Sequence, residues 1–183
     1  MELAIRQEIR EWSAQTLEKP LEEYNGMSGC PYAAASWSNH RVKISFKRNE
    51  SFIPLYQAIE SFDDAYDVDI VVDLEFEEDQ TAYHERIDVI NEAISEGAFG
   101  DRDLWIMGFH PDDFDSQVVD SEDFEPSNDY VYGMMYVQRL AKLHEAAYKL
   151  ERTDYYQSVF GESNPDHVFK TRELFYNKLK EIA

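Results

Sequence analysis

The sequence contains a single thiol, Cys30, which is its most reactive side chain. Pro31 follows it, and proline is typical of the first position of a helix. The spacing predicts a short helix over 32–37 with Cys30 as its N-cap, where unpaired backbone N–H groups lower the pKa of a thiol. We therefore expect Cys30 to act as a thiolate nucleophile or redox group. The alternative is a structural cysteine that packs as a small hydrophobic residue.

A candidate base for this thiol is His110, which directly follows the apolar segment 103–109. That segment predicts a strand, and open α/β sheets place their ligand sites beyond the carboxyl ends of strands. Asp112 or Asp113 could orient the imidazole, so a base-activated thiol formed by Cys30 and His110 is the leading hypothesis. The alternative is a histidine that only ties its own loop to the rest of the fold.

The loop after 103–109 also suggests a divalent metal site formed by His110, Asp112 and Asp113. Mixed histidine and carboxylate ligands suit iron, manganese or zinc. Their spacing matches neither a His-Glu-x-x-His motif nor an EF-hand loop, so the sequence indicates no definite cofactor.

Arg139, Arg41 and Asp112 are the candidate ligand-binding residues. Arg139 would anchor an anionic group of a ligand, and Arg41 belongs to the one compact basic segment, 41–48. The motifs of dinucleotide-binding enzymes, P-loop nucleotide hydrolases and α/β-hydrolases are absent from the sequence. We therefore expect a small-molecule enzyme or ligand-binding protein with its site between Cys30 and His110.

The hydrophobic pattern predicts the elements that must position these residues. Strands are expected at 41–47, 68–76 and 103–109, and helices at 3–19, 32–37, after Ser51, at 81–96, from about 129 to 150, and from Pro165 onward. The segment 103–109 is apolar on both faces, which is typical of a central strand. We predict a single α/β domain over 1–183, with α+β as the alternative, built on a three-stranded sheet from a β-α-β-α-β core. The acidic segment 111–128 would form a lid over the site.

Two of the predicted strands carry opposite charges on one face. Lys43 and Lys47 alternate with apolar residues in 41–47, and Asp69 and Asp73 do so in 68–76. If these strands are neighbours in register, the charges pair across the sheet. The simplest interpretation of the acidic face at Asp69, Asp73 and Glu75 is that it is solvated.

The chain has 183 residues and a formal net charge of −21, and its middle segment, 60–129, holds 24 acidic residues against two basic ones. Such a surface disfavours nucleic-acid binding, because phosphate contacts need basic groups. It favours cations or basic partners, so a non-catalytic protein that docks a basic partner through 60–129 is the alternative function. No apolar run is long enough to span a bilayer, and the charged amino terminus is not a secretory signal, so we expect a cytoplasmic protein without a membrane partner.

Two segments resemble landmarks of a bacterial protein family of unknown function. They read Cys30-Pro31-Tyr32-Ala33 and Phe109-His110-Pro111-Asp112, where the family has Cys-Pro-Phe-Ala after its first helix and Phe-His-Pro-Asp after its last strand. Gln138-Arg139-Leu140 is similar to a pattern in a late helix of the family. The resemblance covers roughly residues 10–150 and implies the same order of helices and strands, but it implies no reaction.

Overall fold

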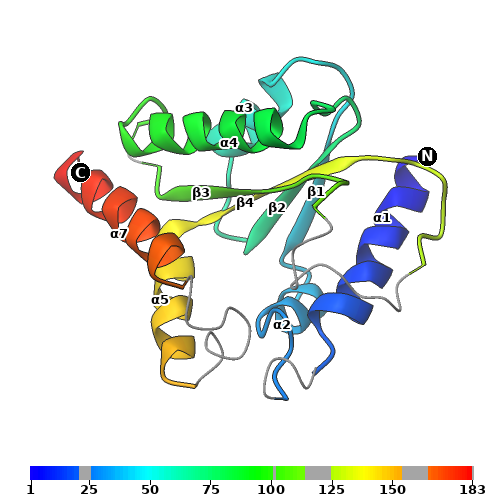
Figure 1. Cartoon of the computed structure of the whole chain (residues 1–183), viewed down its shortest axis with the longest axis horizontal. Coiled ribbons are helices and arrows are strands. Elements are labelled where there is room, and N and C mark those ends of the chain that lie inside the picture. Colours follow the sequence, from blue (N-terminus) through cyan, green and yellow to red (C-terminus); the bar gives the residue numbers. More distant parts are fainter. Residues whose placement is uncertain (21–25, 101, 114–124, 154–164, 183) are drawn as a thin grey trace.

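The computed structural model describes residues 1–20, 26–100, 102–113, 125–153 and 165–182. Its elements follow the chain as α1 (Glu2–Trp12), η1 (Ser13–Leu17), α2 (Ala33–Ser38), β1 (Val42–Lys47), α3 (Ile53–Glu60), β2 (Val68–Asp73), α4 (Gln80–Ser95), β3 (Leu104–Phe109), β4 (Gly133–Arg139), α5 (Leu140–Glu151) and α7 (Pro165–Ile182). In Figure 1, α3 and α4 cover one face of the sheet, and α1 and α2 lie on the other. We call these the α4 face and the α1 face.

The sheet has four strands in the order β1-β2-β4-β3, so the prediction of a mixed helix and strand fold is confirmed and the count of three strands is wrong. β1 and β2 are parallel and are joined through α3, as a parallel connection requires. β4 is antiparallel to both β2 and β3 and lies between them. The strand predicted to be central, 103–109, is therefore an edge strand.

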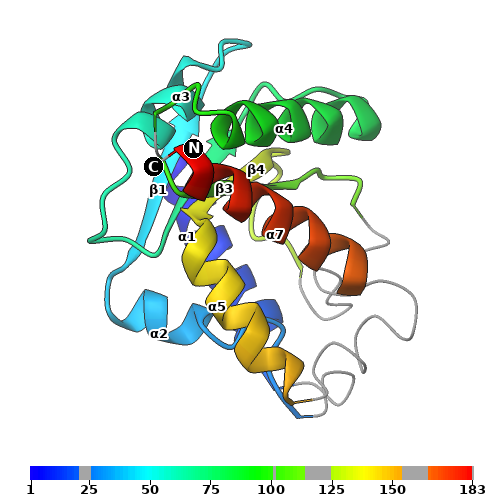
Figure 2. The same cartoon turned by 90° about the vertical axis from the view of Figure 1, so that its left-hand side faces the viewer.

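The edge strand β3 is apolar on both sides because helices cover it in place of a neighbouring strand. The side chain of Asn91 in α4 hydrogen-bonds to the backbone N–H and carbonyl of Ile106 at 2.8 and 2.9 Å, which satisfies that part of the open edge. Trp105 on the α1 face packs against Phe175 of α7, with ring centroids 5.4 Å apart. Figure 2 shows α7 passing close to this edge beside α5.

The new strand, β4, occupies part of the segment that was predicted as one long helix over 129–150. Only Leu140–Glu151 is helical, and Gly133–Arg139 is extended. The helical spacing of Tyr132, Tyr136 and Leu140 suggested the wrong element, because β4 is buried between two strands and its alternation is not visible as polar and apolar residues.

Each face of the sheet has its own hydrophobic core. On the α4 face, aliphatic side chains of β2, β3 and β4 pack against α3 and α4. Gly108 allows α4 to approach closely, because a Cβ at this position would lie 2.3 Å from Cδ1 of Ile87. On the α1 face, Ile5, Ile9 and Trp12 form the stripe of α1 that packs on the sheet.

The predicted charge pairing between the first two strands is confirmed, whereas the predicted solvation is wrong for Asp69 and Asp73, which are buried. The register pairs Lys43 with Asp69 and Lys47 with Asp73, and each pair has an N–O distance of 2.7 Å. These side chains point to the α4 face, and those of Lys47 and Asp73 are each 1% exposed. The ion pair is therefore part of the interior, where breaking it is costly.

Among the described residues, no helix is both long and apolar enough to cross a membrane.

Candidate functional site

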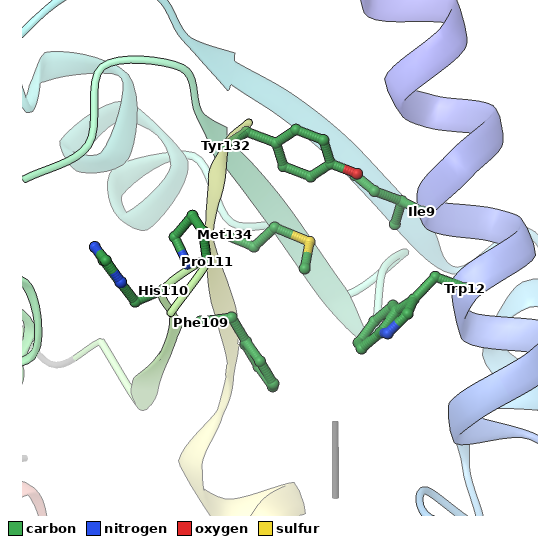
Figure 3. A pocket seen from close by; sticks show the side chains of 7 residues that line it. All are labelled: Ile9, Trp12, Phe109, His110, Pro111, Tyr132 and Met134. Atoms are coloured by element: carbon green, nitrogen blue, oxygen red, sulfur yellow. The ribbon is translucent and has the colours of Figure 1, made fainter. Parts of the chain in front are cut away.

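A cleft of about 160 Å³ opens on the α1 face, between α1 and the ends of β3 and β4 that lie next to one another. Figure 3 shows the side chains around it, which come from α1, from β3 and the turn after it, and from β4 with the residue before it. They are Ile9, Trp12, Phe109, His110, Pro111, Tyr132 and Met134. The cleft wall is therefore mainly apolar and aromatic, as in small-molecule sites.

Ring contacts, one of them edge-to-face, hold Trp12 and Phe109 in the wall. The rings of Trp12 and Phe109 have centroids 6.1 Å apart and planes at 74°. Phe109 also contacts Tyr136, with centroids 4.8 Å apart. These contacts join α1 to β3 and β4 across the α1 face, so the sheet and the helix fix the ring positions before any ligand is present.

Tyr132 is held at the cleft by Glu8, which has a relative exposure of only 4%. The Tyr132 hydroxyl donates to Glu8 Oε1 at 2.6 Å, and the Asn128 N–H donates to Glu8 Oε2 at 3.0 Å. Burial raises the pKa of Tyr132, and the bond to Glu8 and its negative charge raise it further. Tyr132 therefore stays a neutral donor to Glu8, and its ring is fixed beside the cleft.

His110 is buried, and both nitrogens of its ring are hydrogen-bonded. Nδ1 accepts the N–H of Asp112 at 3.1 Å, and Nε2 lies 2.9 Å from the carbonyl oxygen of Glu77, to which it donates in this tautomer. The ring packs edge-on against Phe76 and Tyr83. In Figure 3 it points away from the other side chains of the cleft. This geometry fits the alternative of a loop-tying histidine, since no lone pair is available for a base.

The carboxylates of the same turn also have internal partners. Asp113 accepts from the N–H of His110 at 2.6 Å and from Gln80 at 2.6 Å, and it lies 2.8 Å from Nε2 of His84. Burial opposes ionisation of Asp113, but these hydrogen bonds outweigh it and lower the pKa. Within the described ranges, no three His, Cys, Asp or Glu side chains are arranged to hold a metal ion. The predicted metal set of His110, Asp112 and Asp113 instead closes a turn.

Cys30 is held against the end of η1, where its N–H donates to the carbonyl of Leu17 at 2.8 Å. It is not the predicted N-cap, because α2 begins at Ala33 and the N-cap position is Tyr32, which makes no side-chain capping bond. Burial raises the pKa of the thiol, and this outweighs the lowering by the Tyr32 and Ala33 backbone N–H groups. Among the described residues, no hydrogen bond, ion pair or ring contact joins Cys30 to His110. The backbone of Cys30 bonds to Leu17 and Ala33, whereas the His110 ring bonds to Asp112 and Glu77.

The two candidate arginines lie at the other end of the sheet. Arg139 pairs in register with Leu104 at the start of β3, whereas Met134 pairs with Phe109 beside His110, so the two ends are about 17 Å apart. Arg139 binds Asp64 at 2.8 Å. Arg41 precedes β1 at this same end and binds Asp67 at 3.0 Å. Both guanidinium groups thus have carboxylate partners and neither reaches the cleft.

Sequence reasoning missed Glu8 and Tyr132 as parts of a site. Glu8 follows the polar pattern of an exposed helix position, and only its place directly before Ile9 in the buried stripe distinguishes it. Tyr132 was assigned to a helix, whereas in the structure it directly precedes β4. The predicted lid over 111–128 lies outside the described residues at 114–124.

A scan against models of protein families, a search of curated proteins and a search of solved structures each returned no match. The resemblance to the bacterial family therefore rests on the two motifs and their order along the chain.

Proposed function

We propose that this chain is a small-molecule-binding protein whose cleft between α1, β3 and β4 receives a compact apolar group. The observation that carries this proposal is the cleft itself, with its wall of three aromatic rings, Ile9 and Met134. The rings of Trp12 and Phe109 contact each other, and Glu8 fixes the Tyr132 phenol beside the opening. A preformed apolar wall lowers the ordering cost of binding.

The volume of the cleft limits the ligand. An apolar cavity of about 150 Å³ holds one benzene molecule, whereas drug-sized ligands occupy roughly 300–1,000 Å³. At about 160 Å³ the cleft matches a single ring or a branched alkyl group of similar bulk. The rest of a larger ligand would extend into solvent.

We propose binding rather than thiol catalysis. The ring nitrogens of His110 are already hydrogen-bonded, and burial raises the pKa of Cys30. An activated thiol needs a nearby base with an available lone pair and a lowered pKa. Neither condition is supported by the contacts of these two residues.

We also propose kinship with the bacterial family that carries the two motifs. The second motif supplies Phe109, His110 and Pro111 to the wall of the cleft. If the kinship holds, other members use the same three positions to line a cleft, and His110 serves there to shape the turn.

The proposal is tested by titrating the protein with benzyl alcohol, a neutral ligand of one ring, and following backbone amides by NMR. We expect saturable shifts that centre on Trp12 and Phe109. Met134→Trp, which fills the cleft, should abolish them, whereas Met134→Leu, which nearly conserves volume, should retain them. Equal binding by all three proteins, or shifts elsewhere, would contradict the proposal.

A second candidate function is docking of a basic partner on the outer surface of α4. Glu85, Asp88, Glu92 and Glu96 are exposed along this helix and form no ion pair with any described residue. By contrast, Asp67, Asp69 and Asp73 each form an ion pair with a lysine or arginine of this chain. Binding of a basic peptide that is lost when the four acids become Gln or Asn would support this function, and unchanged binding would oppose it.

A further inference from the structure

We infer that the group received by the cleft is positively charged, and specifically a compact alkylammonium such as a trimethylammonium head. This inference rests on the proposed function, since it names the ligand class of the same cleft. Three features support it: a buried carboxylate with no basic partner among the described residues, aromatic rings in the wall of the cleft, and the strongly negative charge of the chain.

The first feature is the carboxylate of Glu8. It is 4% exposed, and its described partners are all hydrogen-bond donors without charge, namely the Tyr132 hydroxyl, the Asn128 N–H and the Ser127 hydroxyl. The two arginines of the same helix are directed elsewhere, because Arg6 lies over Phe46 and Arg10 binds Glu18.

A buried carboxylate without a counter-ion leaves a negative potential around it, and the surrounding protein screens this potential less than water does. Glu8 is adjacent in sequence to Ile9, which lines the cleft, and it is 2.6 Å from the hydroxyl of Tyr132, which also lines the cleft. The field of this carboxylate therefore reaches the cleft. A cation bound there would supply the opposite charge that the described side chains do not.

The second feature is the wall itself. Trp12, Phe109 and Tyr132 contribute aromatic rings to one small opening, and Figure 3 shows them arranged around Met134. The face of an aromatic ring attracts a cation within about 6 Å of its centre, and cages of such rings recognise quaternary ammonium groups. No Lys or Arg is among the lining residues, so the described wall holds no side-chain cation that would compete.

The third feature acts at longer range. The formal net charge of −21 raises the local concentration of cations and repels anions. The basic groups that could have held an anion, Arg41 and Arg139, are paired with Asp67 and Asp64 at the far end of the sheet. An anionic ligand would thus meet a negative surface and no available guanidinium in the cleft.

The test compares choline with dimethylbutanol, its uncharged analogue in which carbon replaces the nitrogen. The two probes share shape and hydroxyl group, so their difference in affinity measures the contribution of charge. By calorimetry and NMR with the wild-type protein, we expect choline to bind at least about tenfold more tightly. The choline affinity should fall as salt is raised, and the dimethylbutanol affinity should not.

Glu8→Gln removes the charge and keeps the shape of the side chain. We expect it to lower the ratio of the choline affinity to the dimethylbutanol affinity by about tenfold, because a change in the shape of the cleft affects both probes whereas the charge acts on choline alone. Glu11→Gln is the matched control, because it removes the same charge from α1 at a residue whose described hydrogen bond is with Gln7. It should leave both affinities within about twofold. An equal loss from Glu11→Gln would overturn the role of Glu8.

The wild-type comparison separates the two proposals without any variant. Equal or tighter binding of dimethylbutanol would overturn the charge inference and leave the binding function standing. Binding of benzyl alcohol without binding of choline would likewise overturn the charge inference and leave the binding function standing. If none of the three probes binds in the cleft, both the inference and the proposed function fail.

Discussion

Replacing Tyr132 by Phe tests whether Glu8 holds the cleft in its shape. The substitution keeps the ring and removes the hydroxyl that donates to Glu8 Oε1 at 2.6 Å. Hydrogen bonds to charged groups contribute about 1.5–3 kcal/mol, and here the carboxylate that loses its donor is only 4% exposed. We therefore expect the free energy of unfolding to fall by about 2 kcal/mol. For a chain of this size, that loss corresponds to a decrease in Tm of about 4–8 °C.

The assay is urea unfolding followed by circular dichroism, with thermal unfolding as a second measurement. Tyr130→Phe is the matched control, because Tyr130 is exposed and its hydroxyl has no described hydrogen bond. It should change stability by less than about 0.5 kcal/mol. Combining Tyr132→Phe with Glu8→Gln should cost less than the sum of the two single changes. A wild-type stability for Tyr132→Phe would refute the role given to Glu8.

Three further predictions concern groups outside the wall of the cleft. Lys47→Met should lower the free energy of unfolding by about 3–5 kcal/mol, because it leaves the Asp73 carboxylate buried without its ammonium partner. Measured by urea unfolding, the double variant with Asp73→Leu should recover more than half of this loss. A loss below about 1 kcal/mol in Lys47→Met alone would contradict the prediction. Alkylation of Cys30 by iodoacetamide should show a midpoint above about pH 8.5, since burial raises the pKa of this thiol, and a midpoint below that value would contradict the burial of its sulfur. The pKa of Asp113 is lowered in the folded protein. The ionised Asp113 carboxylate therefore adds to the free energy of unfolding above its unfolded pKa of about 3.9, and this stabilisation is lost as the pH falls through the lower folded pKa. Asp113→Asn should accordingly cost about 1–2 kcal/mol at pH 6 and less below about pH 4, and an undiminished cost at about pH 3 would disprove the ionised bond to His84.

Local patterns predicted most elements of the fold, and they failed where tertiary packing decided. The strands β1 and β2 were visible because charged residues alternate with apolar ones in each. The pairing of Lys43 with Asp69 followed from complementary charges at matching positions. β4 was not visible, because its residues from Gly133 to Gln138 carry no charge on either face. Without β4, β3 was wrongly assigned to the centre of the sheet.

Of the candidate site, the sequence predicted only the segment at the carboxyl end of β3. The carboxyl end of β3 does border a cleft, and Phe109, His110 and Pro111 line it. The roles could not be predicted, because they depend on contacts between distant segments. His110 binds the carbonyl of Glu77, and Glu8 binds a tyrosine that lies 124 residues further along the chain. Neither contact leaves a pattern in a single sequence.

The central claim is that the cleft beside Glu8 binds a compact ligand. The measurement that tests it most directly is an NMR titration of the wild-type protein with choline, in which all assigned backbone amides and tryptophan side chains are followed. The account predicts saturable shifts at Trp12, Phe109 and Met134, and unchanged signals at Arg41 and Arg139 at the other end of the sheet. Shifts confined to the end of the sheet near Arg41 and Arg139 would contradict the central claim. So would the absence of a saturable shift with both choline and benzyl alcohol.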